Sequence, residues 1–159
     1  MVLVRDLSTL HKVSLEIKDI KEAKFLSDKL LAYMEEASNC LGVSAIQLGI
    51  DRRICAVKIG KGKDPIVMLN PRIVDSSGTV IKLEGCMSRP YYRYKQRSKF
   101  VTVEYERIYG KRLVRETMEL RDKYARTVQH EIDHMNGITI DTDRFLVRGI
   151  LRNPNYKRG

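Results

Sequence analysis

The sequence predicts an α+β fold in which antiparallel β-sheets pack around one central helix, with a second helix near the N-terminus. Apolar residues recur at helical spacing in residues 19–37 and again in residues 122–136. Between these segments lie short apolar runs, partly β-branched and separated by turn residues, as in antiparallel strands. Because the strands follow one another instead of alternating with helices, an α+β arrangement is favoured over a parallel sheet.

The composition is that of a globular protein. With 159 residues, 43% hydrophobic and 31% charged, residues 1–159 are expected to form a single domain. No apolar run reaches the length of a membrane span, and the N-terminus lacks the apolar core of a signal peptide. Three widely spaced cysteines argue against a disulfide framework. We therefore expect a cytoplasmic protein without membrane contact, and nothing demands more than a monomer.

The formal net charge of +10 predicts attraction to polyanions, of which a ribosome surface is the obvious example. The alternative is that the basic residues only keep the protein soluble. No RNA-binding module with stacked aromatic residues is recognisable. Residues 144–159 form a basic C-terminal tail, which we expect to be partly ordered and to carry no catalytic group.

The first fifty residues predict an arm, a helix and an irregular segment. Residues 1–16 are expected to be extended, with His11 on the surface because no partner lies near it in the sequence. Asp19 is expected to cap a helix that runs to about residue 37. Residues 38–49 fit neither a helix nor a strand. The small residues between Gly42 and Gly49 would let the backbone approach a ligand closely, but a tight turn explains them equally well.

The middle of the chain predicts strands. Residues 53–59 and 66–69 read as adjacent strands, and residues 73–74 and 80–83 flank Ser76-Ser77-Gly78, which is a hairpin signal. Residues 101–105 alternate between apolar and polar, and residues 113–120 return after a turn at residues 109–110. The last helix starts at or near Asp122 and is expected to end at Asn136-Gly137.

This last helix carries the main chemical signal. His130 and His134 are four residues apart, so both rings can point to one place, and Glu131 lies beside them. This H-E-x-x-H pattern indicates two imidazole ligands for a divalent metal ion and a carboxylate general base. The alternative is a surface helix with two unrelated histidines. Two of the three histidines in the chain fall here, which favours the metal site.

The third metal ligand decides between classes of enzyme. One class of metalloproteases with this motif places a histidine where this chain has Ile140, which cannot bind a metal. Another class uses a later glutamate, but the only acidic residues after Glu131 are Asp133, Asp141 and Asp143. The third ligand is therefore expected upstream, and Cys86 is the best candidate.

With three motifs in the same order, the chain resembles the peptide deformylases, which carry G-x-G-L-A-A-x-Q, E-G-C-L-S and Q-H-E-x-D-H. The corresponding segments are residues 40–47, 84–88 and 129–134, and the resemblance extends from about residue 10 to residue 145. The first motif departs from the family, because Cys40 replaces a glycine, Val43 a leucine and Ser44 an alanine. In the second motif Met87 replaces a leucine.

The resemblance implies an enzyme that hydrolyses the N-formyl group of formylmethionine on newly synthesised peptides and releases formate. It implies one divalent metal ion, Fe(II) with Zn, Ni or Co as substitutes, on three ligands: Cys86, His130 and His134. Glu131 would be the general base, and the Gln47 side-chain amide and the Met87 backbone N–H would donate to the developing oxyanion.

The resemblance also implies a groove for the N-formylmethionyl peptide. Leu41 and Gly42 would line it, and the methionine side chain would lie between Leu41, Glu84, Arg93 and the helix of His130. Arg93 is equally compatible with a surface charge, and Glu84 with a structural role. Two alternatives remain at this point, an H-E-x-x-H metallopeptidase and a catalytically silent relative that binds a partner.

Overall fold

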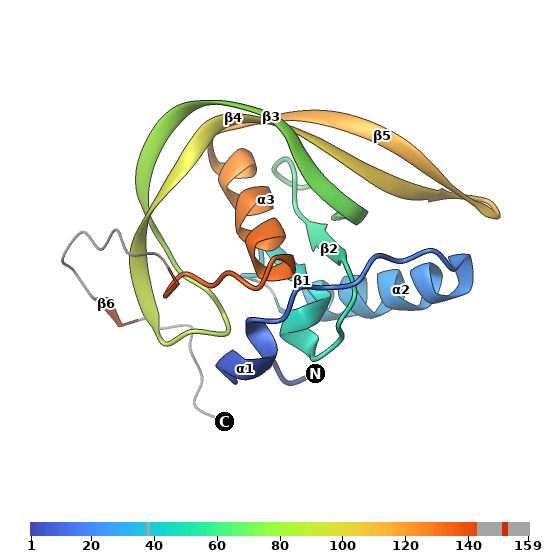
Figure 1. Cartoon of the computed structure of the whole chain (residues 1–159), viewed down its shortest axis with the longest axis horizontal. Coiled ribbons are helices and arrows are strands. Elements are labelled where there is room, and N and C mark those ends of the chain that lie inside the picture. Colours follow the sequence, from blue (N-terminus) through green and yellow to red (C-terminus); the bar gives the residue numbers. More distant parts are fainter. Residues whose placement is uncertain (38, 143–150, 153–159) are drawn as a thin grey trace.

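The computed structural model describes residues 1–37, 39–142 and 151–152 (Figure 1). In chain order its elements are α1 (Leu7–Leu10), α2 (Ile20–Glu36), β1 (Gly42–Ser44), the 3-10 helix η1 (Ala45–Leu48), β2 (Ile54–Val57), β3 (Ile66–Glu84), β4 (Tyr91–Tyr109), β5 (Arg112–Arg121), α3 (Asp122–Met135) and β6 (Leu151–Arg152). This order confirms the expected α+β fold.

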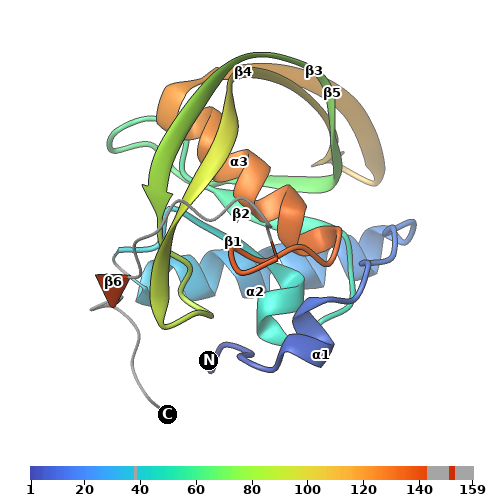
Figure 2. The same ribbon diagram turned by 60° about the vertical axis from the view of Figure 1, so that its left-hand side comes forward.

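The strands pair in the order β1-β2-β3-β4-β5, and every pair is antiparallel. Strand β6 pairs separately with the start of β4. Strands β3 and β4 each contain 19 residues, and together they curl over α3 (Figures 1 and 2). As a result, α3 lies inside the molecule, with the curled strands on one side and β1, β2 and α2 on the other.

Strand β2 separates two parts of the core. Its residues alternate between them: Ile54 and Ala56 pack with the buried side of α2, whereas Cys55 and Val57 pack with α3 and β4. All four side chains are fully buried, which explains why this strand reads as a continuous apolar run. Cys55 is thus a small residue of the core.

The predicted hairpin at Ser76-Ser77-Gly78 is wrong, because β3 runs without interruption from Ile66 to Glu84. Gly78 has a positive φ of 67°, and the pairing with β4 keeps one register on both sides of it. The expected strand end at Asn70-Pro71 is instead a bulge within β3, where the register against β4 shifts.

The N-terminal arm also differs from the prediction, because it begins with the short helix α1. The Asp6 carboxylate accepts hydrogen bonds from the backbone N–H groups of Ser8 and Thr9, at 3.3 and 3.0 Å, and so caps this helix. The predicted helices are confirmed: α2 begins after the cap Asp19, and α3 ends at Met135 with Asn136 as its C-cap. His11 is exposed, as expected.

No helix of the described residues is long and apolar enough to cross a membrane. The expectation for the tail of residues 144–159 lies outside the described residues, apart from the backbone of the two residues of β6.

Candidate metal centre

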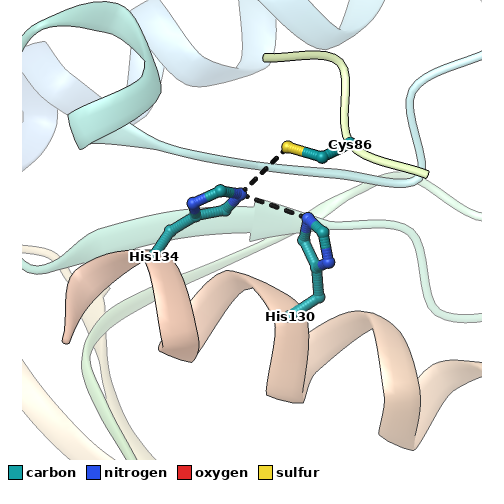
Figure 3. Close-up of side chains that lie close together, drawn as sticks. All are labelled: Cys86, His130 and His134. Atoms are coloured by element: carbon teal, nitrogen blue, oxygen red, sulfur yellow. Dashed lines mark hydrogen bonds between the residues drawn. The ribbon is translucent and has the colours of Figure 1, made fainter. Parts of the chain in front are cut away.

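Three predicted ligands meet at the inner face of α3 (Figure 3). His130 and His134 extend from successive turns of the helix, and Cys86 comes from the loop that follows β3. The Cys86 sulfur lies 3.3 Å from Nε2 of His134, and the two Nε2 atoms lie 3.1 Å apart. The ligand atoms of all three residues lie within 4.8 Å of one another.

This cluster fits a divalent metal ion. A tetrahedral ion with usual bond lengths to nitrogen and sulfur would separate its ligand atoms by roughly 3.3–3.6 Å. The Cys86–His134 and His130–His134 separations are close to these values, and one thiolate with two imidazoles suits both Zn(II) and Fe(II). His130 directs its other nitrogen, Nδ1, toward the Glu84 carboxylate at 3.3 Å, which leaves Nε2 available for the ion.

Glu84 is held in place from two sides. Besides His130, the Arg97 guanidinium contacts it through two hydrogen bonds of 2.9 Å, and a third nitrogen of Arg97 reaches Asp133 on α3. Burial alone would raise the pKa of Glu84, but the hydrogen bonds from His130 and Arg97 outweigh burial and lower the pKa to about 2. Glu84 therefore stays ionised and fixes the His130 ring, while Asp133 binds Arg97.

The two histidines differ in their pKa values in the metal-free chain. Burial opposes the charged form of His130, but contacts with Cys86 and Glu84 raise its pKa well above the usual value. Burial and the neighbouring charge of His130 lower the pKa of His134 well below the usual value. Neutral His134 thus offers a free electron pair to a metal ion without losing a proton first.

The Glu131 carboxyl is buried beside the three ligands. Only 3% of the residue is exposed, and burial raises its pKa to about 7, although the charge of His130 works in the opposite direction. Within the described residues its Oε2 atom has no hydrogen-bond partner. A carboxyl group with a pKa near neutrality can both accept and return a proton, as general acid–base catalysis requires.

Gln47 is anchored by Ser44, the last residue of β1 and the N-cap of η1. Its Oε1 atom accepts hydrogen bonds from the backbone N–H and the hydroxyl of Ser44, at 3.1 and 3.2 Å. The amide nitrogen consequently points to Ser88 Oγ at 3.3 Å and the Cys86 sulfur at 3.5 Å. Ser44, one of the departures in the first motif, thus helps to orient a donor beside the metal centre.

A cavity of about 310 Å³ opens over the cluster. The predicted residues on its wall are Leu41, Gly42, Gln47, Glu84, Cys86, Met87, His130 and Glu131. Arg93 is not on this wall, in contrast to the prediction. Its guanidinium lies 3.6 Å from Asp141, and neighbouring Tyr92 lines the cavity instead.

Cys40, which replaces a family glycine, lines the same cavity but is almost fully buried. Its thiol lies 3.1 Å from the Gly42 carbonyl oxygen. Burial, with a further contribution from Glu131, raises the pKa of the Cys40 thiol to about 12. The thiol therefore stays protonated, and it occupies space in the wall without acting as a nucleophile.

Besides Tyr92, two further groups of residues at the site were missed from the sequence. Arg97 fixes Glu84, and it lies at the same two-residue spacing as the buried residues Val101, Val103 and Tyr105 of β4, a signal that could have revealed it. The others line the cavity from α3: Lys123, Arg126 and Thr127. They lie seven, four and three residues before His130, respectively, and therefore share one face of α3 with it.

The family model of polypeptide deformylase matches residues 2–145. The chain belongs to the polypeptide deformylase family. A peptide deformylase from Rhizobium meliloti is 36% identical over 135 residues, which cover 81% of this chain and 75% of the relative. One from Carboxydothermus hydrogenoformans is 39% identical over 125 residues, 76% of this chain and 79% of the relative.

Solved structures agree with this family. The chain resembles a peptide deformylase from Legionella pneumophila with a TM-score of 0.78 and 30% identity, over 88% of this chain and 82% of that one. A peptide deformylase from Acinetobacter baumannii with bound Met-Ala-Ser gives a TM-score of 0.80 and 25% identity, over 90% and 98%. Peptide deformylases are metal-binding hydrolases that remove the N-formyl group from nascent peptides. Family membership thus favours an enzyme of this class over the metallopeptidase and silent-relative alternatives.

Proposed function

We propose that the chain removes the formyl group from the N-terminal formylmethionine of newly synthesised peptides. One divalent metal ion would be bound by Cys86, His130 and His134. The observation that carries the proposal is the convergence of three ligand atoms within 4.8 Å of one another beside the buried carboxyl group of Glu131. When bound, such an ion acidifies water and polarises a carbonyl group.

The side chains around the site supply the proton transfers. Glu131 takes a proton from the water molecule that attacks the formyl carbon, and it delivers this proton to the amine nitrogen as the carbon–nitrogen bond breaks. Gln47 Nε2 and the Met87 backbone N–H donate hydrogen bonds to the carbonyl oxygen while it gains negative charge. Such donors typically contribute about 3–4 kcal/mol each to transition-state stabilisation. The products are formate and a peptide with a free amino group.

We also assign the native metal ion, the place of the methionine side chain and the location of the protein in the cell. Fe(II) is our choice for the native ion because the family resemblance implies it, and Zn, Ni or Co can occupy the same ligands. The methionine side chain is assigned to the cavity beside Leu41, Gly42 and Glu84. We assign the protein to the cytoplasm as a monomer, and its net charge of +10 supports work close to the ribosome surface.

Formate release from N-formyl-Met-Ala-Ser tests the proposal, with protein loaded anaerobically with Fe(II). Replacing Glu131 by Gln removes the proton carrier but no metal ligand, so we expect formate release to fall roughly 10²–10⁴-fold while bound iron is unchanged. The matched control is Glu119→Gln, which alters an exposed carboxylate on β5 and should leave formate release intact. Undiminished activity in Glu131→Gln, or cleavage of the Met-Ala bond in place of deformylation, would contradict the proposal.

A further inference from the structure

The loop between β3 and β4 carries two groups that we assign to the metal centre, the Cys86 thiol and the Met87 backbone N–H. Cys86 faces the two histidines from outside α3 (Figure 3). The loop makes a tight turn here, in which the Arg89 backbone N–H donates to the Cys86 carbonyl oxygen at 3.0 Å. Because Arg89 closes the turn, any contact that holds Arg89 in place also holds the thiol and the Met87 N–H.

The Arg89 side chain connects this turn to the segment that follows α3. Its Nε atom forms an ion pair with the Asp141 carboxylate, and only 17% and 19% of the two side chains are exposed. The segment of Asp141 is itself joined to the end of α3. The Ile138 backbone N–H donates to the carbonyl oxygen of Asp133, the neighbour of His134, at 2.8 Å. The ion pair thus bridges the loop of one expected metal ligand and the helix of the other two.

A second contact of Arg89 reaches the N-terminal arm. Its Nη1 atom donates to the Arg5 carbonyl oxygen at 3.4 Å. The adjacent Val4 backbone N–H donates to the Gln47 carbonyl oxygen at 2.7 Å, and the Gln47 side chain donates to Ser88 Oγ at 3.3 Å. These contacts join the turn, the arm and η1 in a closed ring, and the Arg89 guanidinium links this ring to the segment that follows α3.

Asp141 lies between two cations. Besides Arg89, the Arg93 Nε atom lies 3.6 Å from the other carboxylate oxygen, and 17% of the Arg93 side chain is exposed. Water and salt screen charges at such a partly buried place less than on the open surface, so the carboxylate and the guanidinium groups hold one another more firmly. The pair of Arg89 and Asp141 is therefore suited to fix the position of the turn relative to α3.

We propose that Arg89 and Asp141 are positioning residues of the metal centre. Their ion pair holds the turn so that the Cys86 thiol meets the two histidines of α3 and the Met87 N–H points to the substrate carbonyl group. Neither Arg89 nor Asp141 lines the cavity, so both act through the turn. This inference rests on the proposed function. Since the thiol is the expected ligand that comes from outside α3, its distance from the helix decides how well a metal ion fits.

The affinity of the metal-free protein for Co(II) tests this inference without a catalytic step. Arg89→Gln and Asp141→Asn each remove one charge and keep a polar side chain. Each is expected to lower the affinity for Co(II) about 10-fold, as when other groups that orient a metal ligand are lost. The double variant should lose little more than either single variant, because the two residues act as one unit. Arg89→Lys keeps the charge beside Asp141 and should retain most of the affinity.

Formate release from N-formyl-Met-Ala-Ser separates positioning from a loss of folded protein. At saturating Co(II), Arg89→Gln should lower kcat roughly 10- to 100-fold, because a small displacement of the Met87 N–H is costly. KM should change little, since this donor acts on charge that develops in the transition state. A merely destabilised protein would instead show normal kcat once corrected for the folded, metal-loaded fraction, and that result would overturn the inference.

The matched control is Arg52→Gln. Arg52 makes the same kinds of contact as Arg89, from Nε to the Glu22 carboxylate at 2.6 Å and from Nη1 to the Asp51 carbonyl oxygen at 2.8 Å, but it does not contact the turn. It should change neither the affinity for Co(II) nor kcat. If Arg52→Gln acts like Arg89→Gln, the effect belongs to the overall charge and the inference is overturned.

Three other results would also overturn the inference: wild-type affinity for Co(II) in both single variants, losses that multiply in the double variant, or a loss in Arg89→Lys as large as in Arg89→Gln. Failure of the proposed function gives a different result. A wild-type protein that binds Co(II) but releases no formate would overturn the proposed function, and the affinities for Co(II) would still decide whether Arg89 and Asp141 position the thiol.

Discussion

Gly42 leaves the room that the Glu131 carboxyl occupies. A Cβ atom on this residue would lie 2.7 Å from Glu131 Oε1, which is too close for any real contact. Gly42→Ala should therefore displace the carboxyl from the metal centre. We expect kcat/KM to fall about 10- to 100-fold, because small misplacements of a catalytic group are costly. The free energy of unfolding should fall by only about 1–3 kcal/mol.

A second variant identifies the cause of that loss. Adding Glu131→Asp to Gly42→Ala shortens the carboxyl and makes room for the new methyl group. The double variant should therefore be more stable than the sum of the two single changes predicts. Strict additivity in urea unfolding, or wild-type kcat/KM in Gly42→Ala, would show that the two groups do not compete for space.

The raised pKa of Glu131 predicts how the stability of the metal-free protein depends on pH. Between the ordinary value of 4.5 and about 7, the folded chain holds a proton that the unfolded chain has released. This carboxyl therefore makes the fold less stable as the pH rises through that window. Metal-free Glu131→Gln should gain stability over metal-free wild type across the same window, by at most about 3 kcal/mol.

Comparing the two proteins cancels the titration of groups that both contain, such as Glu84. Its lowered pKa acts in the opposite direction: it stabilises the fold above about pH 4.5, and that contribution is lost as the pH falls toward 2. Urea unfolding at several pH values provides the measurement. A difference between variant and wild type that stays constant from pH 4.5 to 7 would contradict the buried, proton-binding state of Glu131.

At the scale of elements, Arg97 joins three of them. It extends from β4, binds Glu84 at the end of β3 and reaches Asp133 on α3, and only 6% of its side chain is exposed. Removing one member of a buried ion pair leaves an unpaired charge, so Arg97→Met should cost about 3–5 kcal/mol in the free energy of unfolding. Metal affinity should fall as well, because Glu84 would no longer be held against His130.

The chain contains its own control for this prediction. Arg72 also pairs across β3 and β4, with Glu104, but 60% of its side chain is exposed. Arg72→Met should therefore change the free energy of unfolding by no more than about 1 kcal/mol. Equal losses in the free energy of unfolding for the two variants would mean that the buried position of Arg97 beside the metal centre adds no stability.

Sequence patterns predicted those elements whose cause is local. Helical spacing and end signals were sufficient to predict α2 and α3, and the alternation of apolar and polar residues was sufficient to predict β4. The continuity of β3 could not be predicted in this way, because Ser76-Ser77-Gly78 has the composition of a turn. Its extended path depends on pairing with β4, which lies more than twenty residues away in the chain. Long-range pairing overrode a local signal here.

The same limit applies to the site. A four-residue spacing was enough to bring His130 and His134 together, and the lack of a downstream ligand pointed to Cys86. Which β4 residues reach the cavity depends on the face of the strand to which each side chain points. Tyr92 packs against Gly85, where a Cβ atom would lie 2.5 Å from its ring, so this residue turns to the cavity and Arg93 does not.

At the scale of the whole molecule, the fold encloses the base of the metal centre. The curled β3 and β4 cover α3 from one side, and β1, β2 and α2 close the other, so Glu131 and His134 are almost fully buried (Figure 2). The cavity keeps an opening beside Leu41. The floor of the cavity, with Glu131 and His134, is buried, and an open groove lies above it. This arrangement suits hydrolysis at the end of a peptide chain.

The most direct test of the metal-dependent function is formate release from N-formyl-Met-Ala-Ser while Ni(II) is added stepwise to the metal-free protein. We predict a linear rise that stops at one equivalent of bound Ni(II), because one set of ligands is present in the described residues. Cys86→Ser should bind Ni(II) far more weakly and release little formate at that loading. Formate release that does not depend on added metal, or a Cys86→Ser variant that matches wild type, would contradict metal-dependent deformylation at this site.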